Sequence, residues 1–414
     1  MTRLKLLAAA AAIFAAPAVA SAECDIDASG EVNVITNFFE TLELLSNVMK
    51  ECESDELKID VKLTTQHKEE REQAFAASSS PYDASAVANS SITMLQAKGQ
   101  LMPLNDLVDK YRDEYNIEDQ MLIRFGDEIS AIAFMANAQH FYYRKDLFEK
   151  HGLEVPATYA DLLEAAKVLQ ADESVDHPFG AAFGGPGNWE RGNEFVNILL
   201  ANGGELFDPL TSEPVFNGPQ GVEALELMGE LLNYMSPNAL THDFGQVRQQ
   251  LQQGEIAMAI QWGDQAATMD NENESIVVGK VGFAPAPAMT DGGPPATTFW
   301  WDGYVIPKNL DGDPETAFQV IMHATRSEVV AANNDITLWV RSNYAPSEYS
   351  KAVIDSVMAN APPYPMNPQS ELAHGAIGNN IGDFLGGLES AEQSLADAAS
   401  DYRSAAIDAG LITE

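Results

Sequence analysis

The spacing of hydrophobic residues near the start of the chain predicts a strand, a helix and a second strand. Apolar residues alternate around Val34, recur at helical spacing from Thr41 to Cys52, and alternate again from Leu57 to Leu63. This order is typical of a βαβ unit with two parallel strands. Because the helix runs antiparallel to the first strand, Cys52 is expected at the amino end of the sheet.

Helix and strand patterns keep alternating further along the chain. Thr158 and Asp161 have the spacing of a helix capping box, and apolar residues at helical spacing follow them. Residues 84–88 and 256–260 are expected strands, and small, acidic and apolar residues predict a final helix after Ser390. No segment of 20 to 50 residues repeats, which excludes a solenoid. The alternation predicts an α/β fold.

The N-terminus has the pattern of an export signal. Two basic residues precede an apolar run, Leu6 to Val19, which closes on the small residues of Ala20-Ser21-Ala22. We therefore expect residues 1–22 to be a signal peptide that is cleaved after Ala22. The run is shorter than the roughly 20 apolar residues that span a bilayer, so the mature chain is expected in the periplasm.

Charge and length limit the possible partners and architecture. The chain has 62 Asp and Glu residues against 23 Lys and Arg residues, a formal net charge of −39. A surface this acidic repels nucleic acid and anionic lipid, so no nucleic-acid partner is expected. The roughly 390 residues that remain after cleavage exceed what one hydrophobic core usually organises, which predicts two domains.

Cys24 and Cys52 are the only cysteines of the chain. An oxidising compartment permits them to pair, and we predict a structural disulfide. Closing a loop of this length stabilises a fold by about 3 to 4 kcal/mol on the chain-entropy account. Two thiols and 7 scattered histidines have no metal-ligand spacing. Neither a metal nor a cofactor is predicted.

Polar residues follow two of the expected strands and form a first group of candidate ligand contacts. In open parallel sheets, ligands bind beyond the carboxyl ends of the strands. Asn37, Phe38 and Glu40 lie in the first crossover, and Asn89 and Ser90 follow the strand over 84–88. The alternative for Asn89 and Ser90 is ordinary helix capping.

The segment 134–148, Phe-Met-Ala-Asn-Ala-Gln-His-Phe-Tyr-Tyr-Arg-Lys-Asp-Leu-Phe, resembles the family-one extracellular solute-binding proteins, relatives of the maltose-binding protein. Gly-Glu-Ile-Ala-Met at 254–258 and Trp-Asp-Gly-Tyr-Val-Ile-Pro-Lys-Asn at 301–309 fit the same family in the same order. The resemblance covers nearly the whole mature chain. It implies the two-lobed type II periplasmic-binding-protein fold, in which each lobe is a mixed β-sheet flanked by helices.

The resemblance also implies that three chain crossings join the lobes and act as a hinge. We expect them near Ala133 to Asn137, near Phe283 to Pro287, and near Thr325 to Ala331. The implied N-terminal lobe comprises residues 23–135 and 286–327, and the implied C-terminal lobe comprises residues 136–285 and 328–414.

A sugar offers hydroxyl groups and apolar C–H faces, so its site needs aromatic platforms and amide, carboxylate or guanidinium groups. The family pattern implies such contacts in the interlobe cleft. The candidates are Asn137, Gln139, Trp189, Arg191, Asn193, Trp262, Asp264, Trp300, Trp301, Asp302 and Arg341. For Trp189 and Trp262 the alternative is ordinary packing, and for Asn137 it is a turn.

Trp300 and Trp301 are adjacent at the start of an expected strand and should face opposite sides of the sheet. At most one of them is then easily buried, and we expect Trp301 to be the platform that faces the ligand. Asp302 is a candidate hydroxyl acceptor, with a solvated rim carboxylate as the alternative. Arg341 either clamps a ligand group or pairs with a nearby carboxylate.

These features predict the substrate-binding subunit of a carbohydrate ABC importer, acting as a monomer with membrane permease subunits as partners. The alternatives are a periplasmic glycan-active enzyme and a binding protein that serves a chemosensor. No G-x-S-x-G, Walker or His-Glu-x-x-His motif occurs, so we expect no catalysis.

Overall fold

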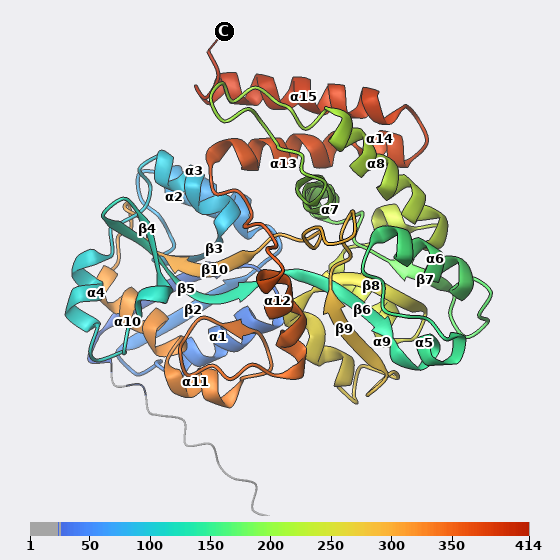
Figure 1. Cartoon of the computed structure of the whole chain (residues 1–414). Helices are drawn as coiled ribbons and strands as arrows, with labels where there is room; N and C mark the ends of the chain where they lie inside the picture. The colour runs from blue at the N-terminus through green and yellow to red at the C-terminus, as the bar shows by residue number, and fades with distance from the viewer. Residues whose placement is uncertain (1–23, 25, 414) are drawn as a thin grey trace, which may run out of the picture.

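The computed structural model describes Cys24 and residues 26–413, and its chain forms two lobes, each built on its own β-sheet (Figure 1). The expected leader, residues 1–22, lies outside the described residues. The strands of the first lobe are β1 (Gly30–Thr36), β2 (Leu57–Leu63), β3 (Ala84–Ala88), β4 (Leu122–Phe125), β5 (Glu128–Asn137), β10 (Trp300–Val305) and β11 (Leu338–Trp339). Those of the second lobe are β6 (Gln139–Arg144), β7 (His177–Gly180), β8 (Ile256–Trp262) and β9 (Val281–Pro285).

The first-lobe sheet has the strand order β11-β5-β10-β3-β1-β2, and β4 pairs with the β5 strand. Strand β1 is parallel to β2 and β3, whereas β10 runs antiparallel to β3 and β5. The predicted βαβ unit is confirmed, with Val34 opposite Val61. The helices of this lobe are α1 (Glu40–Lys50), α2 (His67–Ala76), α3 (Asn89–Ala97), α4 (Asn105–Tyr111), α10 (Pro314–Ala324) and α11 (Ser327–Ala332).

The second-lobe sheet has the order β7-β8-β6-β9, with β6 antiparallel to both neighbours. Both sheets are mixed, and the predicted α/β class is confirmed. The predicted capping box is present as well, because Thr158 Oγ1 accepts from the Asp161 amide at 3.2 Å. The helices of this lobe are α5 (Lys145–His151), α6 (Tyr159–Leu169), α7 (Trp189–Ala201), α8 (Pro219–Leu231), α9 (Phe244–Gln252), α12 (Glu348–Met358), α13 (Pro368–Asn380), α14 (Gly382–Leu385) and α15 (Ala391–Asp408).

The chain passes between the sheets at three places, two of which lie later than the sequence suggested. The first crossing is at Ala138, between β5 and β6. Ala286 and Ala296 pack in the second-lobe core, so the second crossing lies just before β10 and not at 283–287. The third follows β11, which pairs with β5 in the first-lobe sheet, and is not at 325–331. A two-residue strand is too short to show a hydrophobic pattern.

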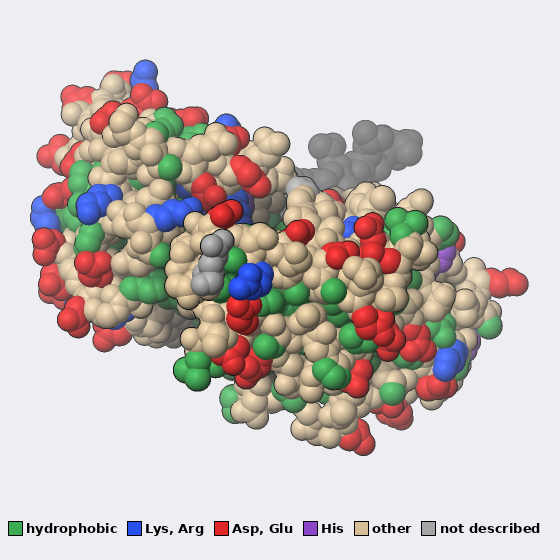
Figure 2. All heavy atoms as spheres, turned by 90° about the horizontal axis from the view of Figure 1, so that it is seen from above, with side chains coloured by type: hydrophobic (Ala, Val, Ile, Leu, Met, Phe, Trp, Pro, Cys, Tyr) green, Lys and Arg blue, Asp and Glu red, His purple; other side chains and the backbone are tan. Residues whose placement is uncertain are grey.

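The disulfide predicted between Cys24 and Cys52 is confirmed, with a Cα–Cα distance of 4.9 Å. It lies at the amino end of β1, because α1 runs back along the first-lobe sheet before reaching Cys52. Among the described helices, none is long and apolar enough to cross a membrane. Acidic side chains are scattered over both lobes on the face seen in Figure 2.

Replacing both cysteines, Cys24→Ser with Cys52→Ser, should lower the free energy of unfolding by about 3 to 4 kcal/mol, because the open chain gains conformational entropy. Urea denaturation measures this loss. Reductant should shift the wild-type midpoint to that of the variant and leave the variant unchanged. Identical midpoints without reductant would show that the bond does not stabilise the fold.

Candidate functional site

An aromatic cluster occupies the junction of the two lobes. Trp300, the first residue of β10, is 4% exposed. Its ring lies edge-on to Trp189 and to Trp262, with ring centroids at 5.5 and 5.7 Å. Tyr364 packs on it at 4.1 Å, and Phe244 packs on Trp262 at 5.7 Å. Trp189, Trp262 and Phe244 are only partly buried, so this cluster presents aromatic surface at its edge.

Polar partners fix the orientation of this cluster. His374 stacks on Trp189 at 4.8 Å, and its Nε2 donates to the Trp189 carbonyl at 2.7 Å. Its Nδ1 therefore accepts from the Tyr364 hydroxyl, at 2.9 Å. Both Tyr364 and His374 are buried. The helix α13, which carries His374, thereby supports the aromatic cluster from behind.

A buried hydrogen-bond chain connects the first two crossings. The Trp300 indole donates to Thr298 Oγ1 at 2.7 Å, and Thr298 donates to Asn197 Oδ1 at 2.7 Å. Asn197 in turn donates to Gln139 Oε1. Thr298 lies at the second crossing, just before β10, and Gln139 lies at the first, where β6 begins. The side chain of Asn197, on α7, therefore bonds to both crossings.

Gln139 and Asn193 belong to this chain of hydrogen bonds and do not reach the interlobe surface. Both are 0% exposed. Asn193 donates to Gln139 Oε1 at 3.2 Å, and Gln139 donates to Glu194 Oε1 at 2.6 Å. Buried amides must satisfy each other, so both are engaged within the core in this structure. Their role as sugar contacts stays a prediction.

A polar group adjoins the aromatic cluster immediately after Trp262. Asn137 donates to Asp264 Oδ1 at 3.0 Å, and Gln265 donates to Asp264 Oδ2 at 3.1 Å. Arg248 donates to Gln265 Oε1 at 2.8 Å. Both oxygens of Asp264 are held by amides, which places a fixed carboxylate beside the aromatic surface. Asn137 and Asp264, predicted separately, are thus brought together.

Burial and the charge of Asp264 raise the pKa of carboxylates in this region. Burial, reinforced by the charge of Asp264, raises the pKa of Asp302 to about 7. Burial also raises the pKa of Asp264, although Asn137 and Gln265 stabilise its charged form. The pKa of Glu40 is raised as well, first by partial burial and then by Asp264. Carboxylates from both lobes therefore approach one another at the junction.

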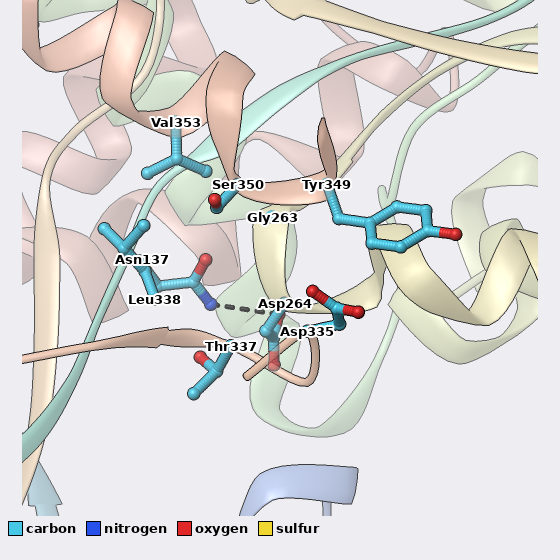
Figure 3. Close-up of a pocket in the computed structure, with 9 residues that line it drawn as sticks. All are labelled: Asn137, Gly263, Asp264, Asp335, Thr337, Leu338, Tyr349, Ser350 and Val353. Atoms are coloured by element: carbon cyan, nitrogen blue, oxygen red, sulfur yellow. Dashed lines mark hydrogen bonds between the residues drawn. The ribbon is translucent and has the colours of Figure 1, made fainter. Parts of the chain in front are cut away.

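A pocket lies where the first and third crossings meet, and Figure 3 shows its lining. It encloses about 230 Å³, including space open to solvent. Asn137 and Asp264 form one side of this hinge pocket, while residues around β11 and from α12 form the other. The lining residues are Asn137, Gly263, Asp264, Asp335, Thr337, Leu338, Tyr349, Ser350 and Val353.

The first-lobe candidates follow β1 and β3 as expected. Phe38 is 60% exposed, and Asn37 uses its side-chain oxygen to accept from the Phe38 amide at 2.8 Å. Asn89 is buried and donates to the Phe299 carbonyl at 3.3 Å, while its Oδ1 has no partner among the described residues. Ser90 is half-buried. A ligand role for this group stays a prediction.

Two predicted arginines have structural partners instead. Arg191 donates to the carbonyls of Phe183, at 2.9 Å, and Gly378, at 3.4 Å, which ties α7 to α13. Arg341 donates to three backbone carbonyls of the first lobe, those of Thr325, Asn116 and Tyr115. Arg341 also lies 3.9 Å from Glu118, which is the carboxylate pairing expected as its alternative. A ligand contact by Arg191 or Arg341 stays a prediction, because a guanidinium has five donors and these bonds use only some of them.

Trp300 and Trp301 divide as the strand geometry predicts, with Trp301 the more exposed. Trp301 packs against a first-lobe apolar cluster that includes Ile92 and Leu95 of α3. Its role as the preferred platform stays a prediction, whereas the aromatic surface gathered at the junction belongs to Trp189, Trp262 and Phe244.

Sequence reasoning missed several residues of the junction, among them Phe244 and Arg248. The signal was available for these two, since Asp243 and Gln246 form a capping box that starts α9. Phe244 and Arg248 are then four residues apart on one helix face. Tyr364 and His374 gave no such signal, because only packing brings α13 to the junction.

Comparison with known proteins places the chain in a family. The model of the bacterial extracellular solute-binding proteins matches residues 42–331. The chain belongs to this family. Among curated solute-binding relatives, a probable ABC transporter-binding protein of Deinococcus radiodurans is 30% identical over 209 residues, 49% of each chain. The mannitol-binding protein of Pseudomonas aeruginosa is 28% identical over 212 residues, 48% of this chain and 46% of that protein. The chain thus spans about half the length of the curated relatives it matches.

Solved structures of solute-binding proteins share the fold. A protein of Agrobacterium radiobacter K84 in complex with ribitol has a TM-score of 0.78 and 21% identity, covering 90% of this chain and 98% of that one. A protein of Agrobacterium vitis S4 with bound D-mannitol has a TM-score of 0.77 and 21% identity, covering 92% and 99%. Maltose-bound MalE3 of T. maritima has a TM-score of 0.76 and 21% identity, covering 90% and 99%. At this identity the likeness shows the fold.

Glu194→Gln should change how the stability of this solute-binding protein depends on pH. Burial raises the pKa of Glu194 from an ordinary 4.5 to about 8. The folded chain keeps this proton where the unfolded chain has released it, so Glu194 reduces stability as the pH rises from about 4.5 to about 8. The free energy of unfolding of the variant should equal that of wild type near pH 4.5 and exceed it near pH 8. Urea denaturation at both values tests this, and a difference independent of pH would contradict it.

Proposed function

We propose that this chain captures a neutral sugar or sugar alcohol between its lobes and delivers it to the permease subunits of an ABC importer. The observation that carries the proposal is the presence, at the lobe junction, of an aromatic cluster that includes Trp262 and of the carboxylate of Asp264, two residues further along the chain. The family membership, the curated mannitol-binding relative and the ligands of the similar structures support it.

The two halves of the junction suit the two kinds of surface on a carbohydrate. The partly exposed rings of Trp189, Trp262 and Phe244 can pack against C–H faces. The carboxyl groups of Asp264 and Asp302 can accept hydrogen bonds from the hydroxyl groups of a carbohydrate. The aromatic surface gives affinity by burial, and the fixed carboxylates select the hydroxyl pattern.

The charge of the junction favours a neutral ligand over a sugar acid. Glu40, Asp264 and Asp302 contribute carboxylates, and Arg248 is the guanidinium that acts on Glu40 and Asp264. An anionic ligand would be repelled by this excess of negative charge in a partly desolvated site.

Closure about the crossings is the proposed mechanism of capture. Asn137, Trp300 and Asp302 lie at the crossings, while Trp262 and Asp264 belong to the second lobe. A ligand that contacts both lobes binds the closed form more tightly than the open form and shifts the population toward closure. Cleavage of the expected leader after Ala22 would release this protein into the periplasm.

A thermal-shift screen should identify the ligand class. At 100 times its Kd, a ligand that binds only the folded chain stabilises it by about 2.7 kcal/mol. We expect a rise in the melting temperature with a neutral compound such as D-mannitol, ribitol or maltose, and none with galacturonate. A rise only with amino acids or peptides would refute the carbohydrate assignment.

Trp262→Ala should raise the Kd of the ligand found in this screen by roughly tenfold or more. A buried apolar side chain of this size contributes roughly 1.5–3 kcal/mol, and 1.4 kcal/mol is tenfold in affinity. Isothermal titration calorimetry measures the change. The matched variant is Trp301→Ala, because Trp301 lies on the face of β10 opposite to Trp300, which packs on Trp262. A loss confined to Trp301→Ala would place the platform on the first lobe.

A further inference from the structure

One face of α13 carries a contact between the second lobe and the first, separate from the chain crossings. Ala373 and Ile377 pack in the second-lobe core, so α13 belongs to that lobe. The helix also packs against α3 of the first lobe. Figure 1 shows α13 above the junction, between α3 and α7.

This contact carries opposite charges from the two lobes. Glu371, in the first turn of α13, forms an ion pair with Lys68 of α2. The side chains of Lys68 and Glu371 are 34% and 12% exposed, so water screens this pair only in part. The pair is an ionic contact between a helix of each lobe.

A second cation lies behind this pair and is incompletely bonded. Arg71, one turn after Lys68, is 0% exposed and donates from Nη1 to the Ala86 carbonyl at 3.2 Å. Its Nε and Nη2 are buried without hydrogen-bond partners among the described residues, and so is Glu371 Oε2. Burial lowers the pKa of Arg71, and Glu371 is the foremost charge that opposes this shift. The charge of Glu371 therefore favours the charged form of a buried arginine of the opposite lobe.

The ion pair of Lys68 with Glu371 joins α13 to a helix that packs away from the crossing strands. Strands β11, β5 and β10, which adjoin the crossings, form one edge of the first-lobe sheet, and β1 and β2 lie beyond β3 at the other edge. The helix α2 packs beside β1. Rotation of the lobes about the crossings would therefore separate Lys68 from Glu371 while the crossings stay joined.

The same helix face also reaches the candidate ligand site. Glu371 and His374 are three residues apart and lie on one side of α13. His374 stacks on Trp189 and donates to its carbonyl. The position of α13 against the first lobe is thus coupled to the aromatic cluster through a single helical turn.

We propose that Glu371 is the residue by which the second lobe holds the first in the closed conformation, with Lys68 as its ion-pair partner. This ionic clasp is a positioning device: it sets the closed fraction and thereby the apparent affinity, without touching the ligand. The inference rests on the proposed function, because only a protein that closes on a ligand has an affinity that depends on an interlobe contact.

Pulsed EPR distances test the clasp without any ligand. Spin labels on Glu43→Cys of α1 and Glu272→Cys, both at exposed positions on different lobes, report the separation of the lobes. Glu371→Gln keeps the side-chain shape and removes the charge. It should reduce the closed, short-distance population by about tenfold, since losing one partner leaves partly buried cations uncompensated. Equal distributions in wild type and variant would overturn the proposal.

Glu70→Gln is the matched control, because Glu70 also lies on α2 and pairs with Lys62 inside the first lobe. It should leave the distances unchanged. Lys68→Met removes the first-lobe partner of the ion pair at a more exposed position. This variant tests the clasp if Glu371→Gln folds poorly. In the double variant Lys68→Met with Glu371→Gln, the closed population should fall by no more than in the more affected single variant, because both substitutions break the same contact. Additive losses would overturn the pairing.

Titration with D-mannitol as the probe separates this proposal from the proposed function. Glu371→Gln and Lys68→Met should raise its Kd by about tenfold relative to wild type, while Glu70→Gln leaves it unchanged. If wild type binds no mannitol, that choice of ligand fails, and the EPR distances still test the clasp. A lower melting temperature in Glu371→Gln with unchanged distances would assign Glu371 a purely structural role and refute the clasp.

Discussion

The burial of Trp300 at the lobe junction is the interaction on which the rest of the site depends. Its backbone belongs to the first-lobe sheet, whereas its ring packs among second-lobe aromatic side chains. A single residue therefore joins the core of one lobe to the sheet of the other. Its indole N–H is satisfied by Thr298, so the ring is fixed by a hydrogen bond as well as by packing. Such a pairing of apolar body and polar tip suits tryptophan to a junction.

The buried amides around Gln139 extend this constraint to the backbone. A buried polar group without a partner costs about 1 to 3 kcal/mol, and the chain from Trp300 through Asn197 to Gln139 satisfies most of its donors and acceptors. Because it ends on residues that flank two crossings, it limits how those crossings move. A rotation of the lobes would then occur in the backbone next to Gln139 and Thr298. The helix α7, which carries Trp189, would move with the second lobe.

Electrostatics act on two scales in this molecule. The excess of acidic residues over the whole surface is screened by salt within about 10 Å and mainly affects solubility. At the junction the same kind of charge is partly desolvated, so Asp264 changes the pKa of Asp302 and Glu40. The amides of Asn137 and Gln265 keep Asp264 oriented despite this repulsion. The carboxylate of Asp264 is therefore held in a fixed orientation at the junction.

The sequence by itself determined the features that depend on neighbouring residues. The βαβ unit around Val34, the capping box of Thr158 and the pairing of Cys24 with Cys52 followed from periodicity, spacing and compartment. The family and its α/β class followed from motifs that keep their order along the chain. Only the tertiary structure decided how the polar side chains are bonded: Gln139 and Asn193 bond to each other in the core, and both arginines bond to backbone carbonyls. It also decided that a two-residue strand after Asp335 moves the third crossing, and that α13 brings His374 behind Trp189, since such long-range packing leaves no local pattern.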